Sequence, residues 1–265
     1  MATLLIVLAI LLALYVFLAF PRLPRRKIDH LKGYDYAHRG LWNDELPENS
    51  AAAFRSAVEH GFGIELDVHV TADDHLIVFH DDTLDRMCGV SGKVADKTLA
   101  ELRALRLKGT EHIMPTFDEF LDIVDGRVPL IIEIKSDKRN DLLCRLVWER
   151  LQRYNGPYCV ESFDPRCVAW FRKNAPQVIR GQLAFGLGNK KRTAINVLLG
   201  TLIQNVLGRP DFVAYEAATD KNPAMGLQRL LRPWLVCWTI HSQADMDRQR
   251  SRYDLQIFDG FVPKR

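Results

Sequence analysis

The chain opens on twenty consecutive residues without a charged side chain, MATLLIVLAILLALYVFLAF, in which Thr3 is the one clearly polar residue. As a helix, twenty residues rise about 30 Å, the thickness of the hydrocarbon core of a bilayer. A buried core helix and a cleavable signal peptide are the alternatives. No basic residue precedes the run, and its exit at residues 18–21, LAFP, is a poor cleavage site. Residues 1–20 are therefore predicted to be an uncleaved transmembrane anchor.

Beyond residue 33, short apolar runs alternate with amphipathic stretches, and this alternation predicts a parallel sheet covered by helices. Strands are expected at residues 34–38, 64–70, 75–80, 129–134, 158–162, 178–184, 211–215, 235–240 and 255–261. Helices are expected at 50–60, 97–107, 117–124, 141–154, 165–174, 191–207, 223–231 and 242–252. The second and third strands are too close in sequence for a parallel crossover, which needs about a dozen residues. They are predicted to form an antiparallel hairpin that turns at Asp73 and Asp74.

The other eight strands suffice to close a (β/α)₈ TIM barrel, and the roughly 230 residues after the basic cluster agree with the size of that fold. An open, doubly wound sheet is the alternative, but the chain contains no Gly-x-Gly-x-x-Gly or Walker phosphate loop. The predicted α/β organisation is an anchor at 1–20, a basic juxtamembrane linker at 21–33 and one barrel domain at 34–265. A small helical insertion at about 84–115 is expected on the catalytic side.

The net charge of +3 is concentrated directly after the apolar run, where Arg22, Arg25, Arg26 and Lys27 lie close together. Without these four residues the chain carries −1, so no nucleic-acid-binding surface is expected. Positive residues prefer the cytoplasmic side of a membrane, which predicts a single-pass protein with an outside N-terminus and a cytoplasmic body. The cluster could equally bind anionic headgroups.

Two further features concern the compartment and the membrane. Five cysteines without a Cys-x-x-Cys pair indicate neither a zinc ribbon nor a disulfide framework, which agrees with a reducing compartment. Residues 191–207 begin with basic residues and continue as an apolar stretch. This stretch is interpreted either as a barrel helix packed on the sheet or as a membrane-resting surface beside the anchor. Protein partners cannot be predicted.

Polar side chains interrupt the apolar strands near their ends. Because strand side chains alternate between faces, Glu65 shares a face with Asp67, and Glu133 shares one with Lys135. A two-residue turn in the hairpin would place His80 opposite Asp67. The polar set at the strand ends comprises His38, Arg39, Glu65, Asp67, His80, Glu133 and Lys135.

Three carboxylates at one end of a barrel repel one another when ionised, and a divalent cation would balance them. Hard oxygen ligands select magnesium, calcium or manganese rather than zinc. Two histidines beside such a cation, with an arginine and a lysine, indicate a phosphodiester site with acid–base catalysis. The remaining histidines are expected to be structural: His30, His60, His69, His75, His112 and His241.

Several motifs follow one another in a characteristic order: AHRG (37–40), PENSAAAF (47–54), IELDVHVTADDHLIVFHDDTLDR (64–86), IIEIKS (131–136), ESFDP (161–165) and CWTI (237–240). With these motifs the chain resembles the glycerophosphodiester phosphodiesterase family over residues 34–262. The resemblance implies a TIM barrel with a small insertion after the hairpin. It also implies His38 and His80 as the acid–base pair, and Glu65, Asp67 and Glu133 as ligands of a divalent cation.

The resemblance further implies that Arg39 binds the phosphate, with Lys135 nearby, and it matches Glu48 to the acid of the Pro-Glu-Asn motif. Trp238 is a candidate for the lining of the leaving-group pocket, with barrel packing as the alternative. Both Glu48 and Trp238 are therefore possible substrate-pocket residues.

Two places depart from the family pattern. His241 stands where the family usually has asparagine, and Gly260 to Pro263 replace its usual ending of the last strand. These departures concern the headgroup preference, because no histidine or carboxylate of the site is lost. Asn49 or Ser50 is interpreted as the N-cap of the following helix.

The sequence therefore predicts a membrane-anchored, metal-dependent hydrolase that converts a glycerophosphodiester to glycerol 3-phosphate and an alcohol. Phospholipase D-like hydrolysis of lysophospholipids or phospholipids is the enzymatic alternative, and the anchor and the apolar stretch at 194–207 favour it slightly. A non-catalytic membrane module that binds headgroups is the third possibility. It is disfavoured because both histidines and all three carboxylates are present.

Overall fold

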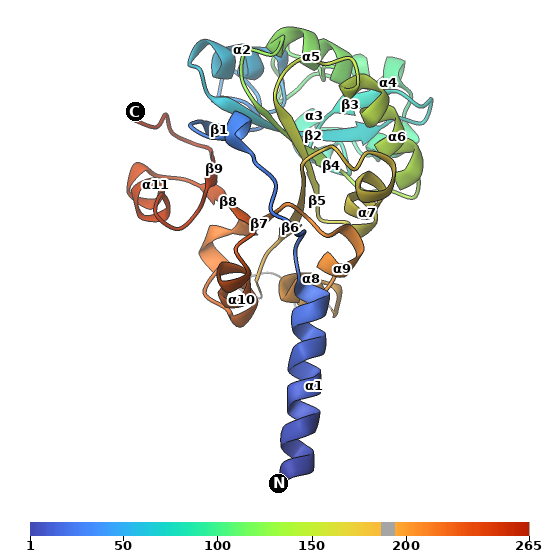
Figure 1. The fold of residues 1–265 in the computed structure, drawn as a ribbon. Coiled ribbons are helices and arrows are strands. Elements are labelled where there is room, and N and C mark those ends of the chain that lie inside the picture. Colours follow the sequence, from blue (N-terminus) through green and yellow to red (C-terminus); the bar gives the residue numbers. More distant parts are fainter. Residues whose placement is uncertain (187–193, 265) are drawn as a thin grey trace.

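Eight parallel strands close into a barrel in the computed structural model, which describes residues 1–186 and 194–264 (Figure 1). Strand β1 pairs with both β2 and β9, so the parallel sheet closes on itself. This closure confirms the predicted TIM barrel and excludes the open, doubly wound sheet. The barrel strands are β1 (Asp35–His38), β2 (Gly63–Val70), β4 (Leu130–Ile134), β5 (Tyr158–Ser162), β6 (Arg180–Ala184), β7 (Phe212–Glu216), β8 (Trp234–Ile240) and β9 (Leu255–Phe258).

The remaining strand, β3 (Leu76–Val78), lies outside the barrel order and pairs antiparallel with β2, as the short link between them predicted. The predicted two-residue turn at Asp73 and Asp74 is wrong. The backbone N–H of Thr71 donates to the carbonyl of His75 across a three-residue loop, at 2.8 Å. The loop closes because Asp74 adopts the left-handed conformation, with φ of 64°.

The longer turn shifts the register of the hairpin by one residue. Val68 pairs with Val78, so that Phe79, whose N–H donates to the Asp67 carbonyl at 3.1 Å, lies opposite Asp67. The predicted pairing of His80 with Asp67 is therefore wrong. His80 follows the end of β3, and it reaches the site from the loop that leaves the hairpin.

Helices surround the barrel, close to their predicted ranges. The predicted helix at 191–207 is different: in the described part it is split into α8 (Ala194–Thr201) and α9 (Asn205–Gly208), while 191–193 lie outside the described residues. Leu202 separates the two with a left-handed φ of 62°. The other outer helices are α2 (Ala51–Glu59), α5 (Phe117–Val124), α6 (Asn140–Leu151), α7 (Pro165–Asn174), α10 (Pro223–Leu231) and α11 (Gln243–Gln249).

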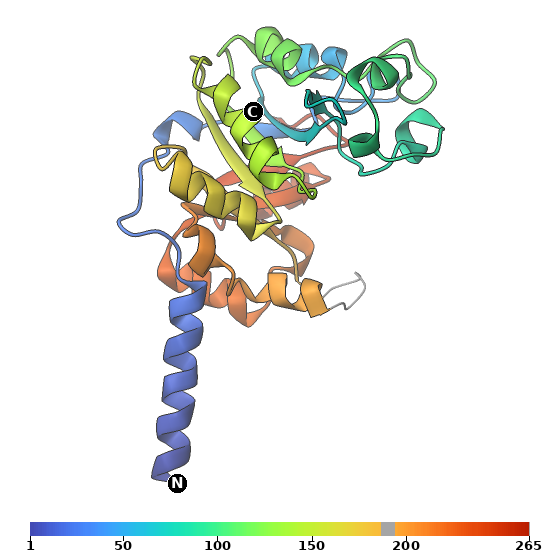
Figure 2. The same ribbon diagram turned by 90° about the vertical axis from the view of Figure 1, so that its right-hand side faces the viewer.

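Residues 84–115 contain two short helices, α3 (Asp85–Cys88) and α4 (Leu99–Arg103), beside the hairpin (Figure 2). This insertion has a small apolar core of its own, which extends to Ile77 and Phe79 of the hairpin. Its buried members are Leu84, Met87, Val94, Leu102, Leu107 and Met114. The insertion is thereby fixed to the strand and loop that carry His80.

The barrel interior changes from apolar to polar along its strands. Residues two apart on a strand share a face. On four of the strands, an inward-facing apolar residue is followed two positions later by an inward-facing polar one. The pairs are Tyr36 and His38, Ile131 and Glu133, Cys159 and Glu161, and Ile257 and Asp259. Charged groups are thus confined to the C-terminal end of the strands, where barrel enzymes have their active sites.

Residues 21–33, predicted as a linker, cross the N-terminal end of the barrel. Ile28 and Leu31 are fully buried against the apolar interior layer. The indole N–H of Trp234 donates to the carbonyl of Arg26 at 2.7 Å, and the Tyr36 hydroxyl donates to that of Leu31 at 2.6 Å. We call residues 21–33 the strap, because they close the end of the barrel opposite to the charged groups.

The basic residues of the strap contact the barrel. Arg22 and Arg26 lie 3.6 and 3.7 Å from the buried carboxylate of Asp211. The Arg25 guanidinium stacks over the Trp234 ring, 3.4 Å from its centroid. These three side chains therefore hold the strap in place.

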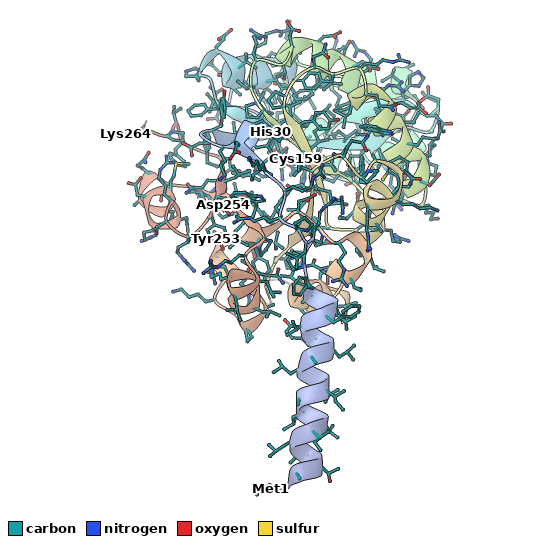
Figure 3. The ribbon with its side chains drawn as sticks, in the orientation of Figure 1. Met1, His30, Cys159, Tyr253, Asp254 and Lys264 are labelled. Carbon is teal, nitrogen blue, oxygen red and sulfur yellow. The ribbon has the colours of Figure 1, made fainter. Side chains whose placement is uncertain are left out.

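The N-terminal helix α1 (Ala2–Ala19) projects from the barrel beside α8, α9 and α10 (Figures 1 and 2). Its 18 residues have a mean hydropathy of 2.9, which makes it long and apolar enough to cross a membrane. Side chains from Met1 onward extend into open space on all sides, far from Cys159 inside the barrel (Figure 3). A membrane span and a signal sequence both have this length and composition.

Two glycines differ in the space available for a side chain, so substitution by alanine should change the stability of the protein in opposite directions at the two positions. A Cβ at Gly181 would clash with the Phe212 ring, so Gly181→Ala should lower the free energy of unfolding by about 1–3 kcal/mol through overpacking. In α10, a Cβ at Gly226 meets nothing within 4 Å, and Gly226→Ala should raise this free energy by about 0.5–1 kcal/mol. Urea denaturation of the detergent-solubilised variants measures both, and equal effects would contradict the interior packing.

Candidate active site

Strand register brings the three predicted carboxylates together. Asp67 of β2 is the neighbour of Glu133 on β4, and Glu65 precedes Asp67 by two residues on the same face. Oxygen atoms from the three side chains lie within 4.8 Å of one another, and all three residues are buried. The structure therefore contains the predicted cluster, at the C-terminal end of the barrel.

Positive charge balances the cluster in part. The Lys135 ammonium lies 2.7 Å from a Glu133 oxygen and 2.9 Å from an Asp67 oxygen. Burial acts to raise the pKa of Asp67, but Lys135 and Arg39 outweigh it and hold this pKa below its usual range. Burial, together with Asp67 and Glu133, raises the pKa of Glu65 well above its usual value. Burial also raises the pKa of Glu133 to about 7, although Lys135 opposes the shift.

The cluster fits a divalent cation. Its donors are all carboxylate oxygens, which magnesium, calcium and manganese prefer. The raised pKa values of Glu65 and Glu133 mean that the side chains of the protein do not fully balance the buried negative charge. A dication bound by Glu65, Asp67 and Glu133 would supply the missing positive charge.

His38 is held by a residue from the other end of the chain. Its Nδ1 lies 2.8 Å from a carboxylate oxygen of Asp259, which directly follows β9. Its Nε2 lies 3.9 Å from a Glu65 oxygen, so the imidazole edge faces the carboxylate cluster. Burial lowers the pKa of His38, although the hydrogen bond to Asp259 acts in the opposite direction. His241 Nδ1 pairs with the second oxygen of Asp259.

His80 has an equivalent partner. Its Nδ1 lies 2.6 Å from an oxygen of Asp81, and Arg86 of the insertion binds both oxygens of Asp81 at 2.6 and 2.9 Å. Burial lowers the pKa of His80 to about 4, while the negative charge of Asp67 opposes this shift. The imidazole is therefore neutral at pH 7 in the free protein.

Arg39 follows β1 in the left-handed conformation, with φ of 60°. Its Nη1 donates to Glu48 at 2.7 Å, and its Nε lies 3.5 Å from an Asp67 oxygen. Glu48 also accepts two hydrogen bonds from Arg86, so it joins the two arginines. Ser50 is the N-cap of α2 as predicted, because its hydroxyl accepts the N–H of Ala53.

Three aromatic side chains stand at the ends of β5, β6 and β8. Trp238 packs edge-on against Phe163 with centroids 5.6 Å apart, and Phe185 lies 5.6 Å from Phe163 on another side. Phe163 also borders a cavity of about 280 Å³ that His80, Glu133 and Lys135 line. The cavity therefore has the charged cluster on one side and the aromatic group on another.

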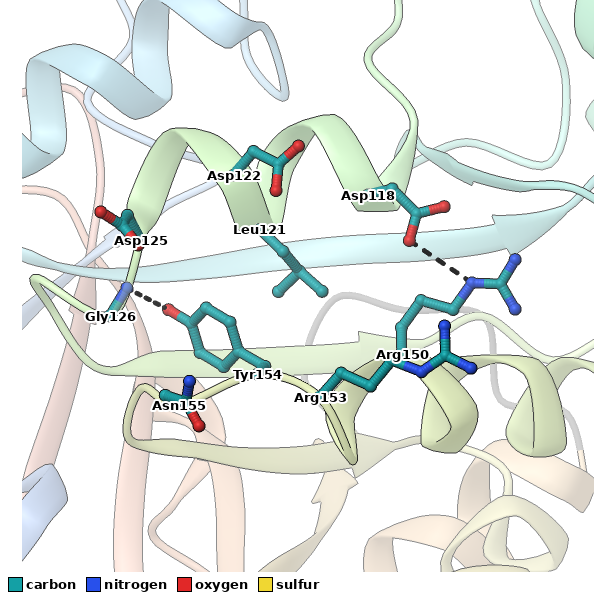
Figure 4. A pocket seen from close by; sticks show the side chains of 9 residues that line it. All are labelled: Asp118, Leu121, Asp122, Asp125, Gly126, Arg150, Arg153, Tyr154 and Asn155. Atoms are coloured by element: carbon teal, nitrogen blue, oxygen red, sulfur yellow. Dashed lines mark hydrogen bonds and ion pairs between the residues drawn. The ribbon is translucent and has the colours of Figure 1, made fainter.

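A larger cleft of about 710 Å³ lies elsewhere, on the outside of the barrel between α5 and α6 (Figure 4). Asp118 pairs with Arg150 across it, and the Tyr154 hydroxyl accepts the N–H of Gly126. None of the predicted site residues lines this cleft. Its size alone does not make it the active site.

Sequence patterns did not single out several residues of the site. Asp259 is the clearest case, because it stands at a strand end but the predicted strand continued past it to residue 261. Asp81 and Arg86 lie inside one of the family motifs, but the motif did not assign them a role. The structure shows that Asp81 binds His80 and that Arg86 binds Glu48. Asn49 was one of two candidates for the helix cap; Ser50 is the cap, and the side-chain amide of Asn49 donates to Asp67 at 2.9 Å.

Comparison with known proteins agrees with this site. Residues 38–253 match the model of the glycerophosphoryl diester phosphodiesterase family. The chain is 30% identical over 295 residues to glycerophosphodiester phosphodiesterase 1 of Bos taurus, an alignment that covers 96% of this chain and 85% of the relative. The chain therefore belongs to the glycerophosphodiester phosphodiesterase family, as its motifs predicted, and members of this family are generally dependent on divalent metals.

Shorter alignments relate the chain to two further proteins. It is 43% identical over 108 residues to a glycerophosphodiester phosphodiesterase of Caldanaerobacter subterraneus subsp. tengcongensis, covering 38% of this chain and 44% of the relative. It is 32% identical over 155 residues to lysophospholipase D GDPD1 of Homo sapiens, covering 53% and 48%. These alignments span about half the length of the two relatives.

The fold also matches a solved structure. An Oleispira antarctica phosphodiesterase, in complex with the product sn-glycerol-3-phosphate, superposes with a TM-score of 0.72. The match covers 86% of this chain and 93% of the other, at 20% identity. At that identity the likeness establishes the shared TIM barrel.

The carboxylate cluster predicts how single substitutions change metal binding. Glu65→Gln, Asp67→Asn and Glu133→Gln should each weaken Mn²⁺ binding by about tenfold or more, because each removes a charged oxygen ligand. Glu161→Gln is the matched control: Glu161 is buried beside Glu133 in the same interior layer but lies outside the cluster. Isothermal titration with Mn²⁺ measures the effect, and thermal melting checks the fold. Unchanged binding in all three variants would contradict a metal site.

Proposed function

We propose that this protein is a metal-dependent glycerophosphodiester phosphodiesterase, which hydrolyses a glycerophosphodiester to glycerol 3-phosphate and an alcohol. The observation that carries the proposal is the grouping of Glu65, Asp67 and Glu133 with two histidines, each of which has a carboxylate on its Nδ1. Membership of the family supports the same chemistry. Magnesium, calcium or manganese would be the bound ion.

Arg39 and Lys135 would bind the phosphodiester. Both cations lie beside Asp67 at the C-terminal end of the barrel, and Glu48 fixes the orientation of the Arg39 guanidinium. Two positive side chains match the charge that develops on the non-bridging oxygens during attack. When bound, the divalent cation would stabilise the same negative charge.

The two histidines would move the protons. We assign His38 as the base that takes the proton of the nucleophile, with Asp259 stabilising the imidazolium that forms. His80 would protonate the leaving alkoxide, because it lines the open cavity through which an alcohol could depart. A bound phosphodiester monoanion would raise the pKa of His80 from about 4, since it opposes the effects of burial, Lys135 and Arg39.

Two nucleophiles are compatible with this arrangement. The 2-hydroxyl of the substrate glycerol could attack first and give a cyclic phosphate, which water would open in a second step with the histidine roles reversed. Alternatively, water would attack the diester directly. Detection of a cyclic glycerophosphate in a rapid quench would separate the two routes.

A lysophospholipid is the alternative substrate, and two observations favour its consideration. The relative lysophospholipase D GDPD1 is named for that activity. The aromatic group of Phe163, Phe185 and Trp238 adds apolar surface beside the cavity. Measuring choline release from glycerophosphocholine and from lysophosphatidylcholine in parallel would identify the preferred substrate. A non-catalytic headgroup-binding module remains disfavoured, because the site keeps every predicted histidine and carboxylate.

We further propose that α1 anchors the protein in the membrane with the barrel in the cytoplasm. The support for this orientation is the basic cluster of residues 22–27, which directly follows the apolar helix. The free cysteines agree with a reducing compartment.

The topology predicts the behaviour of a reporter fused after Arg265, which should be cytoplasmic. Adding four basic residues directly after Met1 should invert or mix the orientation, because the charge difference across α1 then disappears. This design leaves Arg22 and Arg26, which bind Asp211, unchanged. Protease protection in spheroplasts or microsomes measures the orientation. An external C-terminus in the unmodified protein would contradict the assignment.

The histidine roles predict a four-way comparison of two variants and two substrates. If His80 protonates the leaving alkoxide, His80→Ala should lose about 10²–10⁴-fold in rate on a glycerophospho-alcohol. It should lose much less on a p-nitrophenyl diester, whose leaving group needs little protonation. His38→Ala should lose comparable activity on both substrates.

Rates for this comparison are measured at fixed metal concentration and pH. His60→Ala is the control, because His60 is exposed at the end of α2, where its ring contacts the Ser56 carbonyl and stacks on Phe62. Rescue of His38→Ala by the good leaving group would exchange the two roles. Rescue of neither variant would mean that both histidines bind phosphate instead.

A further inference from the structure

The last turn of α1 is docked against the barrel. The side-chain amides of Asn205 in α9 and Gln228 in α10 each donate to the carbonyl of Ala19 at 3.0 Å, and both amides are buried. The Tyr15 hydroxyl donates to the carbonyl of Thr201 in α8 at 3.1 Å. Arg209 adds hydrogen bonds to the carbonyls of Phe17 and Phe20. The helix therefore leaves the barrel in a defined direction.

This docking shortens the part of α1 that is free to cross a bilayer. Residues 2–14 are exposed, whereas burial in the protein begins at Tyr15. The thirteen free residues rise about 20 Å as a helix, and the hydrocarbon core is about 30 Å thick. The difference is removed if the surface around Tyr15 sinks into the membrane, or if the bilayer thins locally.

The surface around Tyr15 is apolar, as its immersion in the membrane would require. Exposed leucines and valines stand on the three helices that contact the last turn of α1, and these helices surround its exit from the barrel (Figures 1 and 2). They are Val197 and Leu198 of α8, Leu207 of α9 and Leu230 of α10, with 39–77% of each residue exposed. Arg209, which stacks on the Phe17 ring, lies at the same level and suits the boundary with lipid phosphates.

We propose that these four residues and the last turn of α1 form a membrane-seated surface, which rests in the same bilayer that α1 enters. The inference builds on the proposed anchor but not on the proposed activity. Lipid rather than a protein covers the membrane-seated surface, because this surface is continuous with a helix that is itself apolar enough to span a membrane.

The membrane-seated surface lies beside the catalytic end of the barrel. A Cβ at Gly200 of α8 would lie 2.9 Å from the carbonyl oxygen of Phe185, so α8 packs directly on the C-terminal end of β6. Phe185 belongs to the aromatic group that adjoins the cavity with His80. The active site would therefore open along the membrane surface, where a lipid-borne diester can enter from the side.

Spin labels on the full-length protein test the depth of this surface. Leu198→Cys and Leu207→Cys, each in a Cys88→Ser background, are labelled and reconstituted in vesicles of phosphatidylcholine and phosphatidylglycerol. Val90→Cys, an exposed apolar residue of the insertion, is the control. At positions 198 and 207, accessibility to oxygen should exceed accessibility to a water-soluble nickel complex several-fold, and the ratio should reverse at position 90. Water-like values at 198 and 207 would overturn the proposal and favour local thinning of the bilayer. Shielding from both reagents would overturn it in favour of a second copy of the chain.

A charged double variant tests the consequence for catalysis. Leu198→Asp with Leu207→Asp should leave kcat/KM on a soluble glycerophosphodiester unchanged, but lower kcat/KM on vesicle-borne lysophosphatidylcholine about 3- to 10-fold, because the barrel is held less closely to the lipid. Val90→Asp should change neither value. Equal activities of the double variant and the parent on vesicles would overturn the proposal. Inactivity of the parent on both substrates would instead overturn the proposed function, and the spin-label result would still decide the depth.

Discussion

The mutual repulsion of Glu65, Asp67 and Glu133 is the constraint around which the rest of the site is arranged. Buried carboxylates at this spacing stay ionised only when positive charge shares the same volume. Lys135 and Arg39 supply two such charges, and the raised pKa values of Glu65 and Glu133 show that these are insufficient. A divalent cation would reverse the sign of this imbalance, because three carboxylates against Lys135, Arg39 and a dication leave a net positive charge. The proposed cation would therefore be needed before the site could attract a phosphodiester anion.

The barrel tolerates this buried charge because its interior is divided into an apolar N-terminal layer and a charged C-terminal layer. Tyr36, Ile131 and Phe212 fill the N-terminal layer, and Ile28 and Leu31 of the strap cover it. Water is thereby excluded from below, so the charged layer is open only at the C-terminal end of the strands. Around that layer, carboxylates recur as orienting partners: Asp259 for His38, Asp81 for His80 and Glu48 for Arg39. Asp259 and Glu48 come from other segments of the chain, whereas Asp81 directly follows the histidine that it holds.

Much of this arrangement could be predicted from sequence, because it depends on local periodicity. Alternation of faces paired Glu65 with Asp67 and Glu133 with Lys135, and the predicted barrel brought these strand ends together. The short link after β2 was enough to identify the hairpin. The hairpin register could not be predicted, because it depends on the left-handed conformation of Asp74. Asp259 was missed because its partner, His38, is 221 positions away. The strap appeared to be a linker because its buried residues, Ile28 and Leu31, are spaced within a stretch that is mostly charged. Contacts between distant segments have no signature in a single sequence.

The pairing of β1 with β9 has a consequence for how the protein is made. β1 follows α1 closely and emerges early from the ribosome, whereas β9 lies close to the C-terminal end of the barrel domain. The barrel cannot close, and Asp259 cannot reach His38, until the last strand has been synthesised. Until then the nascent barrel is an open sheet with two unpaired edges, which are the sites where strands from other chains can add. The proposed anchoring by α1 would hold these unfinished chains in one membrane plane until synthesis is complete.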